Sequence, residues 1–183
     1  MVEIPLVTYP AQVLEQHCLN VRHNQAGCAR CETVCPAQAI HVQDAAVAVD
    51  PERCTGCGLC LHTCPAEVFT THRWSERTVL TNVVELEDAP VDLFCACHPR
   101  PELALGKARS LRIPTCLAAM SPGAWFELGL ERRVTARLDA CHACPLSAAM
   151  SATADAVELA NDWLRDAGHD ARVACVDHVD ESA

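Results

Sequence analysis

Aromatic residues, basic side chains and long apolar runs are scarce in this chain of 183 residues. Phe, Trp and Tyr make up only 4% of it, so the hydrophobic core must be built mainly from aliphatic side chains. Acidic residues outnumber basic ones by 24 to 14, and the formal net charge of −10 argues against a nucleic acid partner. No apolar run reaches the roughly 18 residues of a membrane span, so we expect no direct membrane insertion.

Signals for export and for nucleotide binding are also missing. Residues 1–6 carry neither a basic region nor a long apolar region, so we expect the chain to stay in a reducing cytoplasm. There is no Gly-x-Gly-x-x-Gly fingerprint and no phosphate-binding Gly-Lys-Ser/Thr loop. We therefore expect neither a nucleotide nor a flavin in this chain.

Cysteine, by contrast, is abundant, with 14 residues, and two cysteine runs have a spacing that indicates iron–sulfur chemistry. The second run is complete and reads Cys54-x2-Cys57-x2-Cys60-x3-Cys64, followed by Pro65. In proteins with two cubic clusters, the first three thiolates of such a run bind one cluster and the fourth binds the other. A zinc knuckle or a disulfide framework is the alternative, which the proline after this spacing disfavours.

The first run departs from this pattern. It reads Cys28-x2-Cys31-x3-Cys35, and the position three residues before Cys28 is Gln25 instead of cysteine. One ligand of the first cluster is therefore missing from its usual place.

Cys18 is the candidate for the displaced ligand. It lies ten residues before Cys28, at the end of a stretch over 13–21 whose apolar residues have helical periodicity. We predict that the chain returns the Cys18 thiol to the first cluster. The alternatives are a buried Cys18 that only packs, with a three-iron cluster or an open coordination site beside Gln25.

Residues 15–72 resemble the bacterial two-cluster ferredoxin family, on the two runs and on strand-like sequences at 41–42 and 46–49 between them. The resemblance implies an α+β ferredoxin-like domain over residues 1–75 with two [4Fe–4S] clusters. By position, one cluster would take Cys18, Cys28, Cys31 and Cys64, and the other Cys35, Cys54, Cys57 and Cys60.

About 100 further residues need a core of their own, because the cluster motifs occupy only the first part of the chain. We expect a linker or connecting strand over 76–90 and a second domain over 91–183. Strands are predicted over 91–95, 111–116, 133–138 and 171–176, and helices over 101–110, 122–130 and 147–167. Ser121 is expected to cap the second of these helices and Gly168 to end the third. Such alternation predicts a small α/β domain with an open parallel sheet.

Five cysteines of this second domain follow its strands: Cys95, Cys97, Cys116, Cys141 and Cys144. In a parallel sheet, the loops after the strands emerge at one edge, which is where open α/β sheets bind ligands. We therefore expect these thiols to converge on a third centre.

Residues 90–178 also resemble a known family, the F420-reducing hydrogenase delta subunits, small iron–sulfur subunits associated with methyl-viologen-reducing hydrogenase and heterodisulfide reductase. The likeness rests on the Cys95 and Cys97 pair, Cys116-Leu-Ala-Ala, Glu127-Leu-Gly129 and Asp139-Ala-Cys141-His-Ala-Cys144. It implies a [2Fe–2S] cluster and electron relay between a redox enzyme and a flavin-containing partner. The implied ligands are Cys95, Cys116, Cys141 and Cys144, with Cys97 as the substitute.

Zinc, or no metal at all, remains the alternative at this third site. His98 and His142 adjoin the cysteines and could be ligands, but we expect both to be exposed loop residues. Cys175 lies in the last predicted strand, where we expect a small buried side chain.

Together these features predict a subunit that relays single electrons through two [4Fe–4S] clusters and a [2Fe–2S] centre between partner redox proteins. The expected partners are a flavoprotein, a molybdenum-type oxidoreductase, or a complex like hydrogenase and heterodisulfide reductase. The acidic charge favours a partner with a basic face. The alternative hypothesis is a redox-sensing or maturation factor for a metalloenzyme, and we expect no activity of the isolated chain, since no general base accompanies the cysteines.

Overall fold

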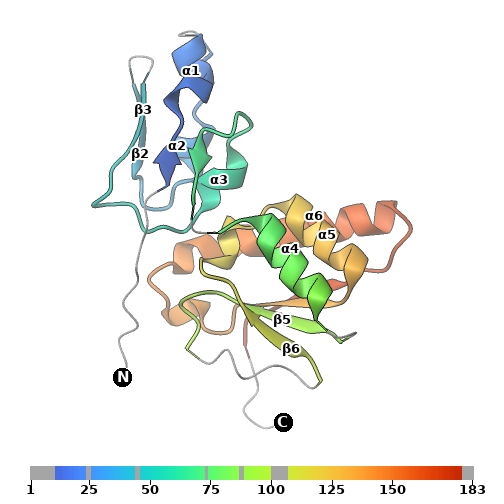
Figure 1. The fold of residues 1–183 in the computed structure, drawn as a ribbon. Coiled ribbons are helices and arrows are strands. Elements are labelled where there is room, and N and C mark those ends of the chain that lie inside the picture. The colour runs from blue at the N-terminus through green and yellow to red at the C-terminus, as the bar shows by residue number, and fades with distance from the viewer. Residues whose placement is uncertain are drawn as a thin grey trace.

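The computed structural model describes residues 11–23, 26–43, 46–72, 74–86, 89–99 and 107–178. Within these ranges the chain forms a small N-terminal part with two two-stranded sheets and a larger C-terminal part with a four-stranded sheet (Figure 1). Gln25 and most of the helix expected over 101–110 lie outside the described residues.

The N-terminal part is made of short elements. They are β1 (Gln12–Val13), a 3-10 turn (Glu15–His17), α1 (Leu19–Arg22), α2 (Arg30–Val34), β2 (Ile40–Gln43), β3 (Ala46–Val49), α3 (Leu59–Thr63) and β4 (Phe69–Thr70). The hairpin of β2 and β3 contains both strand-like sequences that were predicted between the cysteine runs.

The helix-like stretch over 13–21 is not one helix, so that prediction is wrong. Val13 pairs with Phe69 in an antiparallel ladder, and the Leu14 amide donates to the Val68 carbonyl at 2.7 Å. Cys18 has extended backbone angles and separates the 3-10 turn from α1. Pairing with β4 outweighs the local helical periodicity, because tertiary contacts override weak propensities.

The chain repeats one turn after each cysteine run. Gln38 and Glu67 each stand three residues after the last cysteine of a run, and both have a left-handed backbone with φ of 49° and 50°. Each amide donates to the carbonyl of that cysteine, Cys35 or Cys64, at 3.0 and 3.2 Å. The same Cys-Pro-Ala turn therefore leads out of both runs.

The C-terminal part contains a parallel four-stranded sheet in the order β6-β5-β7-β8. Its elements are α4 (Glu76–Glu85), β5 (Val91–Phe94), β6 (Arg109–Arg112), the 3-10 turn η2 (Leu117–Ala119), α5 (Pro122–Glu131), β7 (Val134–Arg137), the 3-10 turns η3 (Cys141–Ala143) and η4 (Ser147–Ala149), α6 (Met150–Asp166) and β8 (Val173–Val176). Ser121 caps α5, since its side chain accepts a hydrogen bond from the Ala124 amide, and Gly168 follows α6 with φ of 82°.

Two elements differ from the sequence-based expectation. The stretch 76–85, expected as part of a linker or strand, is helix α4, which Ser75 caps and which buries Val79 and Val83 on one face. The second strand of the sheet covers Arg109–Arg112 and so starts before residue 111. Beyond it, the Ile113 amide still donates to the Phe94 carbonyl at 2.8 Å.

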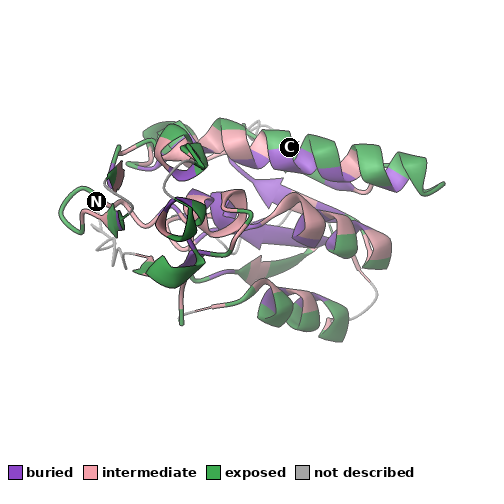
Figure 2. Cartoon of the chain, turned by 90° about the horizontal axis from the view of Figure 1, so that it is seen from above, coloured by how far each residue is buried: buried purple, intermediate pink, exposed green. Residues whose placement is uncertain are grey.

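The core of the C-terminal part lies between the sheet and three helices. Helices α4, α5 and α6 lie on the same face of the sheet (Figure 1). Their outward surfaces are exposed, while the two central strands, β5 and β7, are mostly buried (Figure 2). Trp125 of α5 is completely buried at the centre of this layer. No helix within the described ranges is long and apolar enough to cross a membrane.

Candidate iron–sulfur centres

The four thiols expected around the first cluster lie around one small cavity. Cys18, Cys28, Cys31 and Cys64 all line it, together with apolar side chains of the hairpin and β4. Cys18 and Cys31 are buried, each with 7% of its surface exposed. The structure thus brings Cys18 to three thiols of the cysteine runs, and its ligation of a cluster stays a prediction.

Asn20 holds the Cys18 segment in this position. Its side chain donates to the Cys28 carbonyl at 2.6 Å and accepts from the Cys28 amide at 3.0 Å. The side chain is buried, so both bonds are shielded from water. Sequence reasoning missed this residue, because a single asparagine in a short segment carries no recognisable pattern.

The four thiols expected around the second cluster line a much larger cavity of about 450 Å³. These are Cys35, Cys54, Cys57 and Cys60, so the last cysteine of the first run has joined the second run. Gly56 and Gly58 lie between the ligands with φ of 66° and 81°, a backbone conformation that glycine adopts without a steric penalty.

The five cysteines of the C-terminal part also come together, at the carboxyl edge of the parallel sheet. Cys95 and Cys97 follow β5, Cys116 precedes η2, and Cys141 and Cys144 lie at the turn after β7. After burial, nearby Cys95 and Cys144 also raise the pKa of Cys97, and nearby Cys95 and Cys141 likewise raise that of Cys116. All five lie close together, so the geometry leaves both Cys97 and Cys144 within reach of a third centre.

Backbone amides point at several of these sulfurs. The Ala39 amide donates to the Cys35 sulfur at 3.2 Å, and the Leu146 amide donates to the Cys144 sulfur at 3.4 Å. Hydrogen bonds of this kind stabilise thiolates and tune the potential of a bound cluster. Donor sets made only of thiols, with amides directed at them, fit the soft iron of an iron–sulfur cluster.

Burial makes these thiols weak acids while no metal is bound. It raises the pKa of Cys31 to about 11, and it raises the pKa of Cys60 and Cys141 to about 12, with neighbouring thiols adding to the rise in each case. The pKa of Cys57 is raised in the same way, although the Leu59 amide opposes the shift. Metal binding at these sites must therefore displace protons.

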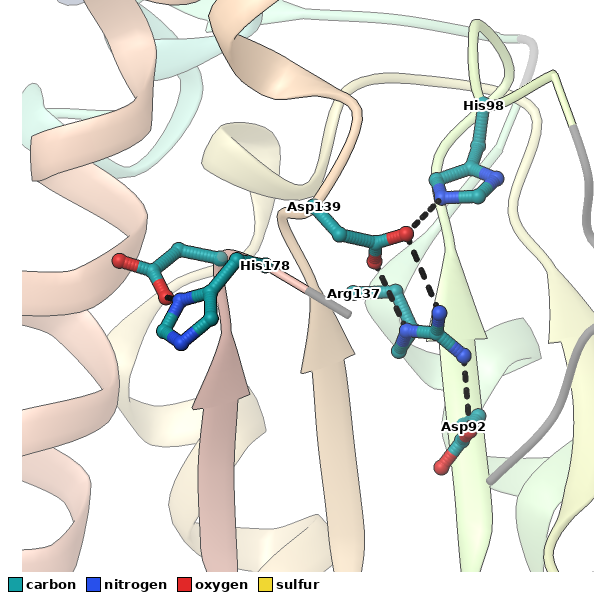
Figure 3. A network of polar contacts seen from close by, with 6 residues as sticks. Asp92, His98, Arg137, Asp139 and His178 are labelled. Atoms are coloured by element: carbon teal, nitrogen blue, oxygen red, sulfur yellow. Dashed lines mark hydrogen bonds and ion pairs between the residues drawn. The ribbon is translucent and has the colours of Figure 1, made fainter. Parts of the chain in front are cut away.

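His98 is buried, with 2% of its surface exposed, which corrects the expectation of an exposed loop residue. Figure 3 shows its ring directed at Asp139, 3.2 Å from Nε2 to Oδ2. Arg137 binds the same carboxylate through two nitrogens at 2.8 and 3.1 Å and reaches Asp92 at 3.2 Å. Arg112, at the end of β6, donates to the His98 carbonyl. His98 therefore connects the segments after β5, β6 and β7, which carry the cysteines.

Burial lowers the pKa of His98, although the nearby Asp139 carboxylate opposes the shift, so the ring is neutral at pH 7. A neutral ring facing a carboxylate donates from Nε2. Arg137 keeps the pKa of Asp139 low despite the burial of that carboxylate. This network therefore binds the loops after β5 and β7 to each other without supplying a free acid or base.

Two smaller expectations have opposite outcomes. His142 is exposed, as predicted. Cys175 lies in β8, but it is exposed instead of buried, because β8 is an edge strand of the sheet.

The cysteine runs and the cavities they line define an iron–sulfur protein with a cluster-binding domain of ferredoxin type. Residues 24–75 match the family model described as the LdpA Fe-S cluster-binding domain. That segment contains both runs and ends just before α4.

Three curated proteins are similar to this chain over short segments. The chain is 49% identical over 43 residues to one subunit of an ion-translocating oxidoreductase complex from Methanosarcina acetivorans, which covers 24% of this chain and 16% of that protein. It is 42% identical over 50 residues to one subunit of the Na⁺-translocating ferredoxin:NAD⁺ oxidoreductase complex from Acetobacterium woodii, with coverage of 27% and 15%. An uncharacterised ferredoxin from Methanocaldococcus jannaschii is 38% identical over 53 residues, with coverage of 28% and 35%.

The chain thus spans only 15% to 35% of the length of these relatives. No solved structure matches it at a significant level.

Proposed function

We propose that this chain is the electron-transfer subunit of a redox complex and passes single electrons along three iron–sulfur centres between partner proteins. Two [4Fe–4S] clusters would be held in a ferredoxin-like domain over residues 1–75, one on Cys18, Cys28, Cys31 and Cys64 and the other on Cys35, Cys54, Cys57 and Cys60. A [2Fe–2S] centre would be held in an α/β domain over residues 91–183, on Cys95, Cys116, Cys141 and Cys144, with Cys97 as the substitute ligand.

One observation carries this proposal. The cavity lined by Cys35, Cys54, Cys57 and Cys60 is also lined by Cys97 and Cys116, which belong to the third set of thiols. Clusters bound there would supply reversible one-electron transfer. Electron transfer from one centre to the next requires the centres to lie close together. A chain that only stored an electron would need a single centre and no neighbouring sets of thiols.

The third site favours a cluster over the alternative of zinc. Five thiols lie near one another there, one more than a zinc ion binds, and two of them, Cys97 and Cys116, also line the cavity of the second set.

The curated relatives support redox proteins as partners, since two of them are subunits of oxidoreductase complexes. We propose that the partner is a flavoprotein, a molybdenum-type oxidoreductase, or a complex like hydrogenase and heterodisulfide reductase. The net charge of −10 favours a basic docking face on it. Stable co-purification with such an enzyme supports the relay, whereas transient binding to a metal-free enzyme would support a maturation role.

The test is the iron and acid-labile sulfide content after anaerobic purification, read together with electron paramagnetic resonance of the oxidised and reduced chain. We expect about ten irons per chain and a [2Fe–2S] signal distinct from the cubic clusters. About eight irons with zinc and no [2Fe–2S] signal would contradict the third centre, and a three-iron signal would contradict ligation by Cys18.

A further inference from the structure

The N-terminal and C-terminal parts meet where the start of α3 packs against η2. At the centre of this contact, Gly58 faces Ala119. A Cβ atom placed on Gly58 would lie 2.3 Å from the Ala119 Cβ and 3.1 Å from the Ala119 Cα. The first distance is far inside van der Waals contact, so the two segments can approach this closely only because residue 58 has no side chain.

A hydrogen bond next to this contact links the same two segments. The His62 ring, on α3, lies with Nε2 3.1 Å from the Ala118 carbonyl. Both Ala118 and Ala119 are buried, each with 1% of its surface exposed. The Ala118 and Ala119 side of the contact is therefore closely packed, which makes the contact sensitive to a change of a single methyl group.

Both sides of the contact are adjacent in sequence to proposed ligands. Gly58 directly follows Cys57, and η2 directly follows Cys116. Cys57 lies in the same apolar cluster as Ala118, with Cys97 and Cys116 packed against it. Cys57, Cys97 and Cys116 also line the same cavity. Cys18, by contrast, lines the other cavity, with none of these residues.

We propose that the contact between Gly58 and Ala119 sets the spacing between the second [4Fe–4S] cluster and the third centre, so that electrons cross between the two parts of the chain here. This inference rests on the proposed function for the presence of both centres. In the step it describes, one of the two centres, held by Cys57 and Cys116 and their neighbours, would give up one electron and be oxidised, and the other would take up that electron and be reduced. No bond changes and no proton moves, and a redox partner protein resupplies the electron.

The test compares Gly58→Ala with Gly168→Ala in the complete, cluster-loaded chain. The two glycines have nearly the same φ, 81° and 82°, but a Cβ on Gly168 would meet nothing within 4 Å. Both variants therefore carry the same backbone strain, and only Gly58→Ala forces η2 away. The readout is the magnetic interaction between the two centres in the fully reduced chain, seen as splitting or broadening of their resonance signals. We expect Gly58→Ala to lose this interaction and Gly168→Ala to keep it.

Gly58→Ala could also abolish the magnetic interaction by preventing the second cluster from binding. A double variant distinguishes this from the effect of the clash with Ala119. Gly58→Ala combined with Ala119→Gly removes the atom at 2.3 Å, so the splitting should return. An unchanged splitting in Gly58→Ala, its loss in Gly168→Ala as well, or its absence from the double variant would each overturn the proposal.

A metal-independent measurement separates this inference from the proposed function. Amide hydrogen exchange over 117–120 should rise in Gly58→Ala, not in Gly168→Ala, and should fall again in the double variant. If the unsubstituted chain shows no third resonance signal, the proposed relay fails, while the exchange data still decide whether Gly58 holds η2 in place. Unchanged exchange in Gly58→Ala would overturn the contact itself.

Discussion

Asn20 illustrates how much of the first cluster site depends on one polar side chain. Cys18 is separated from Cys28 by a stretch of the chain that includes Gln25, and the two bonds of Asn20 to the Cys28 backbone span that interval. A displaced ligand needs such an anchor, because an untethered loop would lose conformational entropy whenever it delivered its thiol.

We predict that Asn20→Ala releases Cys18 from the first cluster. The variant removes two shielded hydrogen bonds and leaves backbone groups of Cys28 unpaired, at a cost of about 1–3 kcal/mol for each group. The expected result is a three-iron resonance signal in the oxidised chain and a drop of about one iron per chain, since one of the four cubic irons loses its thiolate.

Asn161 offers a matched control. Its side chain donates to the Val173 carbonyl at 2.7 Å and accepts from the Val173 amide at 3.2 Å, so it makes the same pair of bonds in the C-terminal part. Asn161→Ala should lower the unfolding temperature without any three-iron signal. If both variants gave that signal, general instability would explain it and the role of Asn20 would be refuted.

The cysteines were predictable at this scale, and their polar neighbours were not. Their fixed spacing identifies the two cysteine runs directly, and the cysteine missing at position 25 points to Cys18 as a replacement ligand. His98 was expected at the surface because its partner Asp139 is 41 positions away in the chain, a separation that no local pattern reveals. Cys175 was expected to be buried because a strand sequence does not say whether the strand lies at the centre or at the edge of the sheet.

Among the helices, the close packing of α5 on α6 depends on Gly129. A Cβ there would lie 2.6 Å from the Leu164 Cδ1 and 3.1 Å from the Val173 Cγ2. Leu164 is completely buried, so it has little room to move aside. Glycine is required at this position of the helix because any larger residue would collide with the Leu164 side chain.

We predict that Gly129→Ala destabilises the chain by up to about 2 kcal/mol. Alanine improves helix propensity by about 1 kcal/mol, but overpacking a full core costs about 1–3 kcal/mol. In the same helix, Gly123→Ala should be neutral or stabilising by up to about 1 kcal/mol, because the nearest atom to its Cβ is the Ser121 Oγ at an ordinary 3.6 Å. Urea unfolding of the cluster-loaded chain measures both, and equal effects would show that packing is not the cause.

The parallel sheet could be predicted from the alternation of elements, but α4 could not. Its apolar pairs at 79–80 and 83–84 suit a strand as well as a helix over so short a window. What decides in favour of a helix is the cap at Ser75 together with burial of Val79 and Val83 on the core formed by α5 and the sheet. That core belongs to a distant part of the sequence.

At the scale of the whole molecule, the two parts differ in what holds them together. The small buried core of the N-terminal part includes Cys18 and Cys31, whereas the C-terminal core is a larger layer of mainly aliphatic side chains around Trp125, with Cys95 at its edge. We therefore expect the smaller part to depend on bound metal for its stability, as small metal-binding domains commonly do.

We predict that anaerobic removal of iron with a chelator unfolds the N-terminal part and leaves the C-terminal core folded. Amide hydrogen exchange should rise over 11–72 to the level of an unfolded chain, while α5 and α6 remain protected. Retained protection over 11–72 in the iron-free chain would contradict this prediction.

The affinity of the chain for iron–sulfur clusters should depend on pH, because the pKa values of the thiols are raised. Iron-free thiols with pKa values of about 11 to 12, such as those of Cys31, Cys60 and Cys141, hold their protons at neutral pH, whereas cluster-bound sulfurs do not. Cluster binding therefore releases protons, becomes weaker as pH falls and continues to strengthen as pH rises past 9. Iron loss to a competing chelator at equilibrium should increase from pH 8 to pH 6, and a constant loss across this range would refute the coupling.

The exchange of cysteines between the two runs would make the two proposed cubic clusters depend on each other. Cys35 leaves the first run to line the second cavity, and Cys64 leaves the second run to line the first. Each run thus contributes one cysteine, just before the repeated turn, to the site formed mainly by the other run. Neither site has its full set of thiols unless both runs are in place. If oxidation destroyed one cluster, the run that binds it would become mobile, and that run also carries one ligand of the other cluster. We therefore expect the two clusters to be assembled together and lost together.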